Sequence, residues 1–494
     1  MSEEPRRRLP FHPVLVSVFP ILAVYSANVG LFPLRDLIRP LLFATLASTI
    51  LLLVFAGARR SFERGAIVSS VAFVGLWGAR SISSATHLPD WTMWLVMMLF
   101  VGAGWWWSHR PALPTNFLNR FSLLLVVVAG VTIGLKSRPN APPAEGRRAT
   151  TVSRTSPDVF FILLDGYGRQ DQLKRVFGFD SSPFVDELKG QGFFVAERAR
   201  SNYCQTSLSL ASALNLDWIQ GLFPKGNADR LELNSLVDRP KVVRDLRAIG
   251  YDTVAISTGF PGFDFSGFDL VIDQPAEVTY FESTLLELTP ISMPGQMVDS
   301  QYDRRRLYLV EGFGALNKMA ARTAKPRFVF AHILAPHPPF VFDAEEPVRP
   351  RGAFSYQDGS DYFDSGKTAE SYASGYVGQL RWLNVRVIET VRTLVNRPGP
   401  KPIVMILSDH GSKLHLDQND LSKTDVQESF STLGAYLVPE DLRGQFGDEE
   451  TPLSAMRKVH AYITGLPAPR SENRSYYSPF SQPDAFVEVT DRVR

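Results

Sequence analysis

The sequence predicts an α-helical membrane portion of about five transmembrane helices, followed by an α/β domain built in three layers. The first observation is a change in charge density: residues 1–136 hold 12 Lys and Arg and 5 Asp and Glu, whereas residues 137–494 hold 40 and 45. One globular domain does not show such a change. The second is a series of five apolar stretches within residues 1–136, and the third is an alternation of short apolar runs with amphipathic segments in the rest of the chain.

The apolar stretches predict membrane helices at Pro13–Leu34, Leu41–Gly57, Ala66–Trp77, Trp91–Trp107 and Phe121–Leu135. A membrane helix needs roughly 17 to 25 mainly apolar residues. The third stretch reaches that length only if it continues through Arg80 towards Ile82. Tryptophan residues at the ends of stretches are typical of membrane–water interfaces. The alternative is a set of buried helices in a large soluble protein, and the succession of five stretches favours the membrane.

Arginine residues at alternate ends of these stretches predict the orientation in the membrane. One set of ends carries Arg6, Arg7, Arg8, Arg59, Arg60, Arg64, Arg110 and Arg120, and the opposite set carries Arg35, Arg39 and Arg80. Because the more basic ends remain in the cytoplasm, five helices place the chain after Lys136 on the outer face. A cleaved signal peptide is the alternative for the first stretch, but no small-residue cleavage site is evident. We therefore expect a multi-pass protein of the cell (inner) membrane with an extracytoplasmic domain.

The expected organisation is a transmembrane domain over residues 1–136, a linker over 137–156 and an outer domain over 157–494. The linker is rich in Pro, Ala, Ser and Arg without a hydrophobic period, as in a flexible tether. Cys204 is the only cysteine, so no intramolecular disulfide can form, and a domain of this size folds without one. Neither part has a strong basic stripe interleaved with aromatic residues, which argues against nucleic acid as a partner.

Short apolar runs in the outer domain predict buried parallel strands at Val159–Leu164, Thr253–Ile256, Phe328–Ile333, Ile403–Leu407 and Ala435–Val438. Segments with helical periodicity lie between them, at Ser182–Gly190, Lys241–Gly250 and Ser371–Asn396. Alternation of strands and helices is typical of a three-layer α/β domain. The Pro-rich and polar segment from Asp441 to Arg494 indicates an edge segment or a mobile tail.

Two of the predicted strands end in residues that can bind a metal. Asp165 and Gly166 follow the first strand, and Asp409 and His410 follow the fourth after Ser408. Polar residues just beyond the carboxyl ends of such strands face the ligand crevice. Carboxylates and an imidazole together suit a divalent ion. The alternatives are a turn or a helix cap at Asp165, and a cap formed by Ser408 and Asp409.

A loop that becomes a helix, Ser201–Asn215, carries the candidate nucleophile. Thr206 is expected near the helix N-terminus, where free N–H groups and the helix dipole stabilise an anion such as phosphate or sulfate. A hydroxyl bound to a divalent ion is also activated as a nucleophile. The alternative is that Thr206 or Ser207 only caps the helix. Cys204 is a second candidate, although a lone cysteine is more often a small buried residue.

Histidines concentrate in or beside the loops at the strand ends, at positions His332, His337, His410 and His415. This concentration indicates at least one functional histidine. His337, held between two prolines, is predicted to bind substrate oxygens or to protonate the leaving group. His332 is expected either to contact substrate or to serve structure, and His415 either belongs to a second metal site or lies exposed.

The order Asp165, Thr206, His337 and Asp409-His410, behind five membrane helices, resembles the sulfatase-like branch of the alkaline phosphatase superfamily. It is most similar to lipoteichoic acid synthases and lipid A phosphoethanolamine transferases. The resemblance covers most of residues 157 to 440 and implies a sulfatase/alkaline-phosphatase-like domain. It implies a zinc or manganese ion bound by Asp165, Thr206, Asp409 and His410, with Thr206 as the nucleophile. The residues expected to contact substrate are His337, His332 and Asn202.

Three departures from the family refine this expectation. The nucleophile loop Cys204–Leu208 lacks the Pro and Arg usual in sulfatases, which weakens the case for sulfatase activity. Leu164 precedes Asp165 where those enzymes usually have paired Asp, so we expect one metal ion rather than two. The transferases usually carry several disulfides in their outer domain, which a chain with one cysteine cannot form, so their particular substrate does not transfer.

The sequence therefore predicts a metal-dependent phosphotransferase anchored in the membrane. It moves a phosphate-linked headgroup from a membrane phospholipid donor to an envelope glycan or lipid acceptor, with Thr206 as nucleophile and one divalent ion, Zn or Mn. The first alternative is a hydrolase of phosphate or sulfate esters on the outer face of the membrane. The second is a metal-binding envelope protein without catalysis, against which the presence of Thr206 argues.

Overall fold

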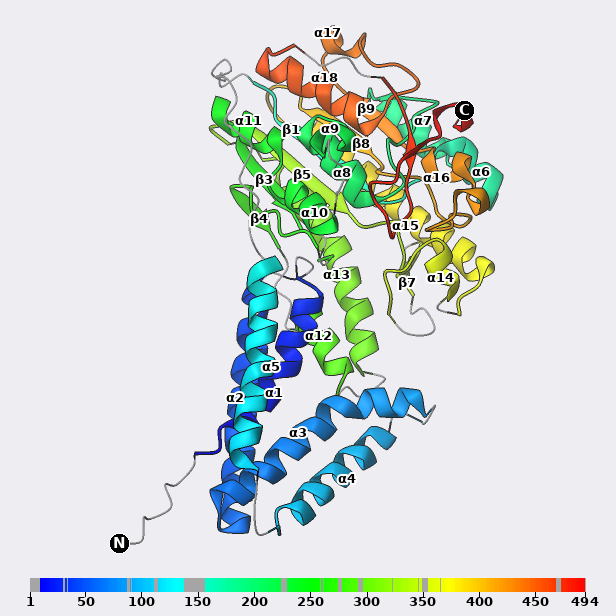
Figure 1. The fold of residues 1–494 in the computed structure, drawn as a ribbon. Coiled ribbons are helices and arrows are strands. Elements are labelled where there is room, and N and C mark those ends of the chain that lie inside the picture. Colours follow the sequence, from blue (N-terminus) through cyan, green and yellow to red (C-terminus); the bar gives the residue numbers. More distant parts are fainter. Residues whose placement is uncertain are drawn as a thin grey trace. The chain divides into compact units, whose positions relative to one another are not determined.

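The computed structural model describes residues 9–29, 32, 34–86, 89, 91–110, 114–136, 156–223, 229–257, 259–260, 262–273, 278–291, 296–321, 323–344, 346–348, 354–364, 366–467 and 472–493. The chain forms two compact units, traced in Figure 1. One comprises residues 1–141 and 276–300, and the other residues 142–275 and 301–494. The predicted linker over 137–156 lies outside the described residues apart from Ser156, as do Arg6, Arg7 and Arg8.

The first unit contains a helix in each predicted apolar stretch: α1 (His12–Ala27), α2 (Ile38–Arg59), α3 (Phe62–Ala85), α4 (Thr92–Trp107) and α5 (Thr115–Lys136), with the short η1 (Leu34–Leu37) before α2. Among the described residues, three helical segments are long and apolar enough to cross a membrane: Leu34–Arg59, Phe62–Ser83 and Thr115–Lys136. The third stretch does continue past Ile82. The first is shorter than predicted, because the Asn28 side chain donates to Val24 O at 2.8 Å where α1 ends.

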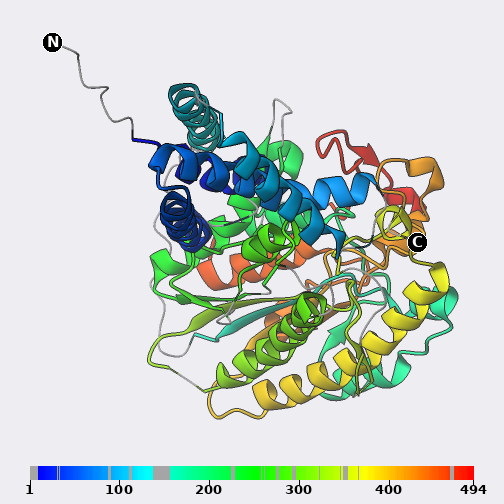
Figure 2. The same cartoon turned by 90° about the horizontal axis from the view of Figure 1, so that it is seen from below.

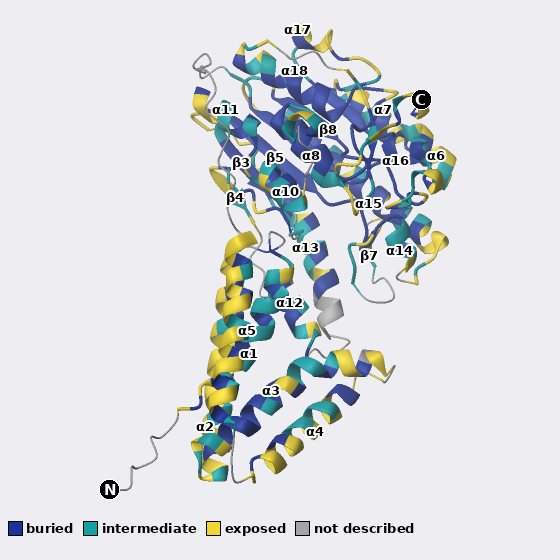
Figure 3. Cartoon of the chain, viewed as in Figure 1, coloured by how far each residue is buried: buried dark blue, intermediate teal, exposed yellow. Residues whose placement is uncertain are grey.

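The outer surface of this unit is apolar. Large hydrophobic side chains lie exposed along α2 and α5, including Leu42, Phe43, Leu124 and Val128, and Figure 3 shows α5 as largely exposed. Many exposed apolar side chains of this kind are costly in water and are stable against hydrocarbon. The predicted helical portion is thus present, with five apolar helices.

A segment from the middle of the sequence joins the first unit. Helix α12 (Tyr280–Glu287) begins with a capping box at Thr279 and buries Phe281. The Phe281 ring lies 5.7 Å from Tyr25 and 5.1 Å from Phe32, measured between ring centroids. The Glu282 carboxylate pairs with the guanidinium of Arg39 on α2. The apolar pattern of the first 136 residues did not reveal this segment.

The second unit is built on a seven-stranded sheet with the strand order β2-β9-β8-β1-β5-β3-β4. The strands are β1 (Val159–Leu164), β2 (Phe194–Val195), β3 (Asp252–Ile256), β4 (Leu270–Ile272), β5 (Arg327–Ile333), β8 (Ile403–Leu407) and β9 (Gly434–Leu437). The central strand β1 pairs in parallel with both β5 and β8. Within this sheet, the sequence missed only the short strands β2 and β4.

The direction predicted for the last strand is wrong. Strand β9 pairs with β8 in the antiparallel sense, with Leu407 opposite Gly434. A strand that pairs in parallel needs a crossover connection that brings the chain back to the end of the sheet where the previous strand began. The connection after β8 contains only the short η2 (Leu421–Lys423) and α16 (Val426–Phe430), and it turns back at the same edge. A buried apolar run does not reveal its own direction.

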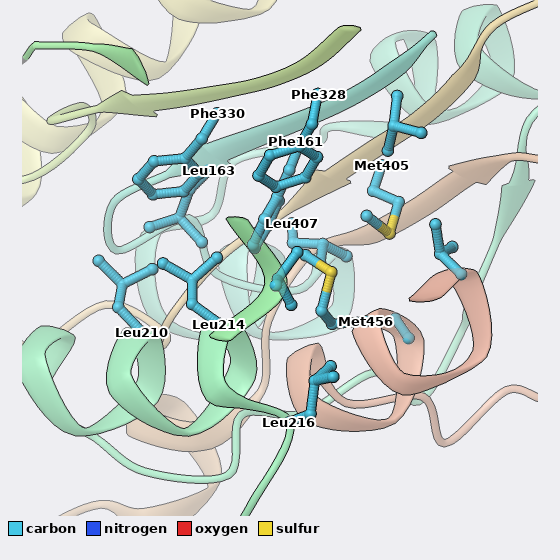
Figure 4. Close-up of a cluster of buried hydrophobic side chains, with 14 of the residues drawn as sticks. Phe161, Leu163, Leu210, Leu214, Leu216, Phe328, Phe330, Met405, Leu407 and Met456 are labelled. Atoms are coloured by element: carbon cyan, nitrogen blue, oxygen red, sulfur yellow. The ribbon is translucent and has the colours of Figure 1, made fainter. Parts of the chain in front are cut away.

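Helices cover both faces of the sheet and confirm the three layers. One face packs on α8 (Thr206–Asn215), α10 (Arg230–Asp238), α11 (Lys241–Ile249) and α18 (Pro452–Thr464), which share a hydrophobic core with the strands. Figure 4 shows side chains of this core, including Phe161, Leu214 and Met456. The other face carries α13 (Gln296–Lys318) and α15 (Ala369–Val395), seen in Figure 2 as the green and yellow helices below the sheet.

The C-terminal segment is an integral part of the second unit, so the prediction of an edge segment or mobile tail is wrong. Helix α18 packs against α8, and Met456 is in the core. Strands β10 (Tyr476–Tyr477) and β11 (Val487–Glu488) pair with each other. The remaining elements are α6 (Gln170–Phe177), α7 (Ser182–Gly190), α9 (Ile219–Leu222), β6 (Phe342–Asp343), β7 (Glu346–Pro347), α14 (Ser360–Asp364), α17 (Glu440–Arg443) and η3 (Thr490–Arg492).

Candidate active site

Three predicted metal ligands meet at the carboxyl edge of the sheet. Asp165 follows β1 and Asp409-His410 follow the adjacent parallel strand β8, so their side chains reach the same point. The His410 Nε2 atom lies 3.4 Å from Asp165 Oδ1 and 3.3 Å from Asp409 Oδ2. All three residues are buried, and neither of those carboxylate oxygens has a hydrogen-bond partner. Two unsatisfied oxygens and one imidazole nitrogen that converge in this way fit a divalent cation.

The imidazole of His410 is oriented as a metal ligand. Its Nδ1–H donates to Gly411 O at 2.9 Å, which leaves the Nε2 lone pair directed at the two carboxylates. Burial lowers the pKa of His410, and the charge of Asp409 opposes the shift only in part. The neutral ring, which is the form that binds metal, is therefore favoured.

A hydrogen bond from a second histidine orients Asp165. The His332 Nε2–H donates to Asp165 Oδ2 at 2.8 Å, so Oδ1 is the oxygen left to face His410. Burial disfavours the charged carboxylate, but the charge of His337 and the His332 hydrogen bond outweigh it and lower the pKa of Asp165. The turn after Asp165 depends on Gly166, which has φ of 76° and donates its N–H to Asp409 Oδ1 at 3.2 Å.

Thr206 lies at the first position of α8, facing the ligand cluster. Its hydroxyl donates to His410 Nε2 at 3.3 Å. Unlike the three predicted ligands, Thr206 is only partly buried. The Ser209 hydroxyl donates to Asp409 O at 2.8 Å and so ties the first turn of α8 to the loop after β8. The candidate nucleophile thus combines contact with the ligands, a helix N-terminus and access from outside.

The C-terminal segment holds the loop that precedes Thr206. The Ser475 hydroxyl donates to Ser201 O at 2.6 Å. The Asn202 amide group donates to Arg474 O at 3.0 Å and accepts from Leu453 N at 3.1 Å. Asn202 was predicted to contact substrate, and its amide is engaged by the protein rather than directed at the ligand cluster. That contact stays a prediction.

His337 lies beside Asp165. Its backbone N–H donates to Asp165 O at 3.1 Å, and its Nδ1–H donates to Pro338 O at 2.6 Å. The other ring nitrogen, Nε2, lies 3.6 Å from Asp358 Oδ2. The His337 ring therefore lies beside a carboxylate and close to the predicted metal ligand Asp165.

Two other sequence candidates lie apart from the ligand cluster. His415 is 57% exposed in its side chain and donates through Nδ1 to Glu428 Oε2 at 2.7 Å. With Asp425 these residues form a second possible cation group, although Glu428 already accepts from Ser412 and Leu414. Cys204 is buried, and burial raises its pKa to about 11, which disfavours the thiolate.

Three buried charged residues near the site belong to no motif that the sequence reveals. Asp358 accepts from the Tyr372 hydroxyl at 2.8 Å. The Lys413 ammonium lies 3.9 Å from Asp358 Oδ2. Arg305 on α13 donates through Nη2 to His337 O at 3.5 Å. Lys413 could have been suspected from its place three residues after His410, whereas Asp358 and Arg305 lie far from the motifs in sequence.

Comparison with known proteins finds similarity to several solved structures. One is the integral membrane protein lipooligosaccharide phosphoethanolamine transferase A from Neisseria meningitidis, with 12% identity, a TM-score of 0.41 and coverage of 92% of this chain and 94% of that one. Another is the C-terminal periplasmic domain of EptC from Escherichia coli in complex with zinc, with 11% identity, a TM-score of 0.42 and coverage of 71% and 98%. A third is a 2-O GAG sulfatase, with 11% identity, a TM-score of 0.41 and coverage of 66% and 78%.

Neither a protein-family model nor a curated protein matches the chain. The solved structures to which the chain is similar in fold thus include phosphoethanolamine transferases and a sulfatase.

Proposed function

We propose that this chain is a metal-dependent phosphotransferase of the cell (inner) membrane, with its α/β domain on the outer face. It transfers a phosphate-linked headgroup from a membrane phospholipid to an envelope glycan or lipid, through a covalent intermediate on Thr206. One observation carries the proposal: the Thr206 hydroxyl, at the N-terminus of α8, lies 3.3 Å from His410 Nε2 in a buried group with two unpartnered carboxylate oxygens.

The residues that would hold the metal are Asp165, Asp409, His410 and Thr206. A bound zinc or manganese ion would polarise a phosphoryl oxygen and would make the Thr206 hydroxyl a stronger nucleophile. One ion is expected, because the second oxygen of Asp165 is occupied by His332.

The protein's own groups supply the remaining chemistry. In the first step the Thr206 oxygen attacks phosphorus, and the bond to the diacylglycerol oxygen breaks. We assign His337 as the donor of the proton that the leaving oxygen takes up, and the proton that Thr206 loses restores His337, so that the step balances. The free N–H groups of the first turn of α8 bind the non-bridging oxygens. In the second step an acceptor hydroxyl attacks the phosphothreonine, and its proton returns to Thr206.

The apolar helices of the first unit support anchoring in the membrane that contains the donor. Three of the helical segments have the length and composition of membrane spans. A tethered enzyme meets a lipid at a far higher effective concentration than a free one does. This argument favours a phospholipid over a dissolved ester as the donor.

The test is the intact mass of the purified chain after incubation with divalent metal and mixed phospholipids. We expect wild type to gain a headgroup-sized mass, and Thr206→Ala to gain none. The matched control is Ser207→Ala, because the neighbouring Ser207 hydroxyl donates to Asn234 instead, at 3.0 Å, and its loss leaves the adduct in place. Release of free headgroup without an acceptor favours the hydrolase. Bound metal without adduct or product contradicts both forms of the proposal.

A further inference from the structure

Arg305 is a buried cation with almost no partner. The residue is 2% exposed, and its Nε and Nη1 atoms are buried without a hydrogen-bond partner. The Nη2 atom reaches His337 O at 3.5 Å, and the guanidinium lies 5.6 Å from the Tyr356 ring centroid. In the described part of the chain Arg305 forms no ion pair.

The other buried arginines of the described residues are all paired with a carboxylate. Asp158 pairs with both Arg397 at 2.6 Å and Arg327 at 3.6 Å. The remaining pairs are Arg169 with Asp171, Arg200 with Glu449 and Arg457 with Asp217. Because an unpaired buried charge is costly, proteins keep one only where it serves a purpose. Arg305 is therefore the exception that needs an explanation.

The charges around Arg305 leave it uncompensated. The carboxylates of Asp165 and Asp409 would balance a divalent ion. Asp358, the carboxylate that faces His337, already lies near both the Lys413 ammonium, at 3.9 Å, and the His337 ring, at 3.6 Å. Burial lowers the pKa of Arg305 to about 10, so the side chain stays charged at neutral pH. Arg305 thus has no ion-pair partner of its own in the described part of the chain, and the Asp165 charge that acts on it belongs to a predicted metal ligand.

We infer that Arg305, assisted by Lys413, binds the anionic oxygens of a phosphate group of the substrate beside the metal ligands. The inference rests on the proposed function and identifies the residues that recognise its substrate's charge. A guanidinium presents a planar set of donors that matches a tetrahedral oxyanion, and charge-assisted hydrogen bonds of this kind are strong. The phosphate belongs either to a lipid headgroup or to free inorganic phosphate, since both present the same oxygens.

The experiment compares full-length wild type with Arg305→Met in detergent, after metal content has been measured and equalised. Binding of inorganic phosphate is followed by calorimetry, and use of phospholipid in mixed micelles is followed by KM. We expect Arg305→Met to weaken phosphate binding roughly 10- to 100-fold without lowering the midpoint of thermal unfolding. If KM for the lipid rises while the affinity for inorganic phosphate is unchanged, the subsite is assigned to the headgroup phosphate.

The matched control is Arg397→Met, which removes a paired buried arginine away from the ligand cluster. It should lower the unfolding midpoint, because Asp158 loses a partner, while phosphate affinity stays as in wild type. Arg305→Lys keeps the charge without the planar donors and should give an intermediate affinity, which tests the inference if the Met variant folds poorly.

Wild-type phosphate affinity and wild-type KM in both Arg305 variants overturn the inference and leave Arg305 as support for the His337 main chain. The Thr206 adduct is measured on the same samples. An adduct on the wild type, with unchanged phosphate affinity and unchanged KM in the Arg305 variants, refutes the subsite alone. Loss of phosphate affinity in those variants, with no adduct on any sample, refutes the transferase and retains the oxyanion site.

Discussion

Removal of divalent metal is expected to destabilise the wild-type chain and to leave an Asp409→Asn variant almost unchanged. Without metal, Asp165 Oδ1 and Asp409 Oδ2 face each other's charge around His410 and have no hydrogen-bond partner. Metal binding to the folded state alone stabilises it, by about 4 kcal/mol when the free metal is 1,000 times Kd. Asparagine at position 409 keeps an oxygen to accept from Gly166 N–H but removes the charge that the metal needs.

The size of the effect follows from the size of the unit. For about 330 residues in the unit that holds the site, an unfolding entropy of roughly 2.1 cal/mol/K per residue amounts to about 0.7 kcal/mol/K. A change of about 4 kcal/mol then shifts the midpoint of thermal unfolding by about 6 °C.

The assay is thermal unfolding of the full chain in detergent, followed by circular dichroism with excess zinc or manganese and then with a chelator. We expect the midpoint of wild type to fall by about 6 °C on chelation, and that of Asp409→Asn to change by a small fraction of this. Equal shifts in the two proteins would refute the assignment of Asp409 as a ligand. An unchanged midpoint for wild type, with metal shown to bind beforehand, would refute the cluster as the site.

Three further predictions follow from particular contacts. His332→Leu should lower metal affinity roughly 10- to 100-fold in competition with a chromophoric chelator, and His332→Gln, which can still donate to Asp165 Oδ2, should retain more of it. Burial and the charge of Asp264 raise the pKa of Asp238 to about 8. A carboxyl whose pKa is raised on folding makes the protein less stable as the pH rises from the unfolded pKa to the folded one. Unfolding midpoints of wild type should therefore fall between about pH 4 and pH 8 more steeply than those of Asp238→Asn, and parallel curves would contradict this. Gly411→Ala should lower the free energy of unfolding, measured with denaturant, by well over the ~1 kcal/mol of an average substitution. The reason is that the added Cβ would lie 2.0 Å from Glu428 O. The control is Gly190→Ala, where nothing lies within 4 Å of the added Cβ.

Local patterns predicted the elements that carry the candidate ligands. The strands β1 and β8 were predicted with the bounds that the structure has; Asp165 follows β1 directly, and Asp409-His410 follow β8 after Ser408. Helix α8 begins at Thr206, which was expected near its N-terminus. These predictions succeeded because a buried strand is a short apolar run, and because ligands at a strand end are placed by the strand that precedes them.

Long-range contacts escaped prediction because they leave no local pattern. The direction of β9 is set by the path of the chain after β8, and the last 50 residues are held in place by bonds such as that from Ser475 to Ser201 O. Helix α12 joins the apolar unit through Phe281 and Glu282, far in sequence from the helices that they contact. Periodicity reports which side of an element is buried, and it does not report what buries it.

The sequence by itself determined an apolar helical portion, an α/β domain and the three side chains of a candidate metal site, because each can be recognised from residues that are neighbours along the chain. Only the tertiary structure decided which oxygen of Asp165 faces His410, and which buried arginine lacks a carboxylate. The physical reason is that hydrogen bonding and charge compensation depend on all the groups around an atom. The groups around Arg305 come from α13, from the loop after β5 and from the chain at Tyr356, and these segments meet only in the folded molecule.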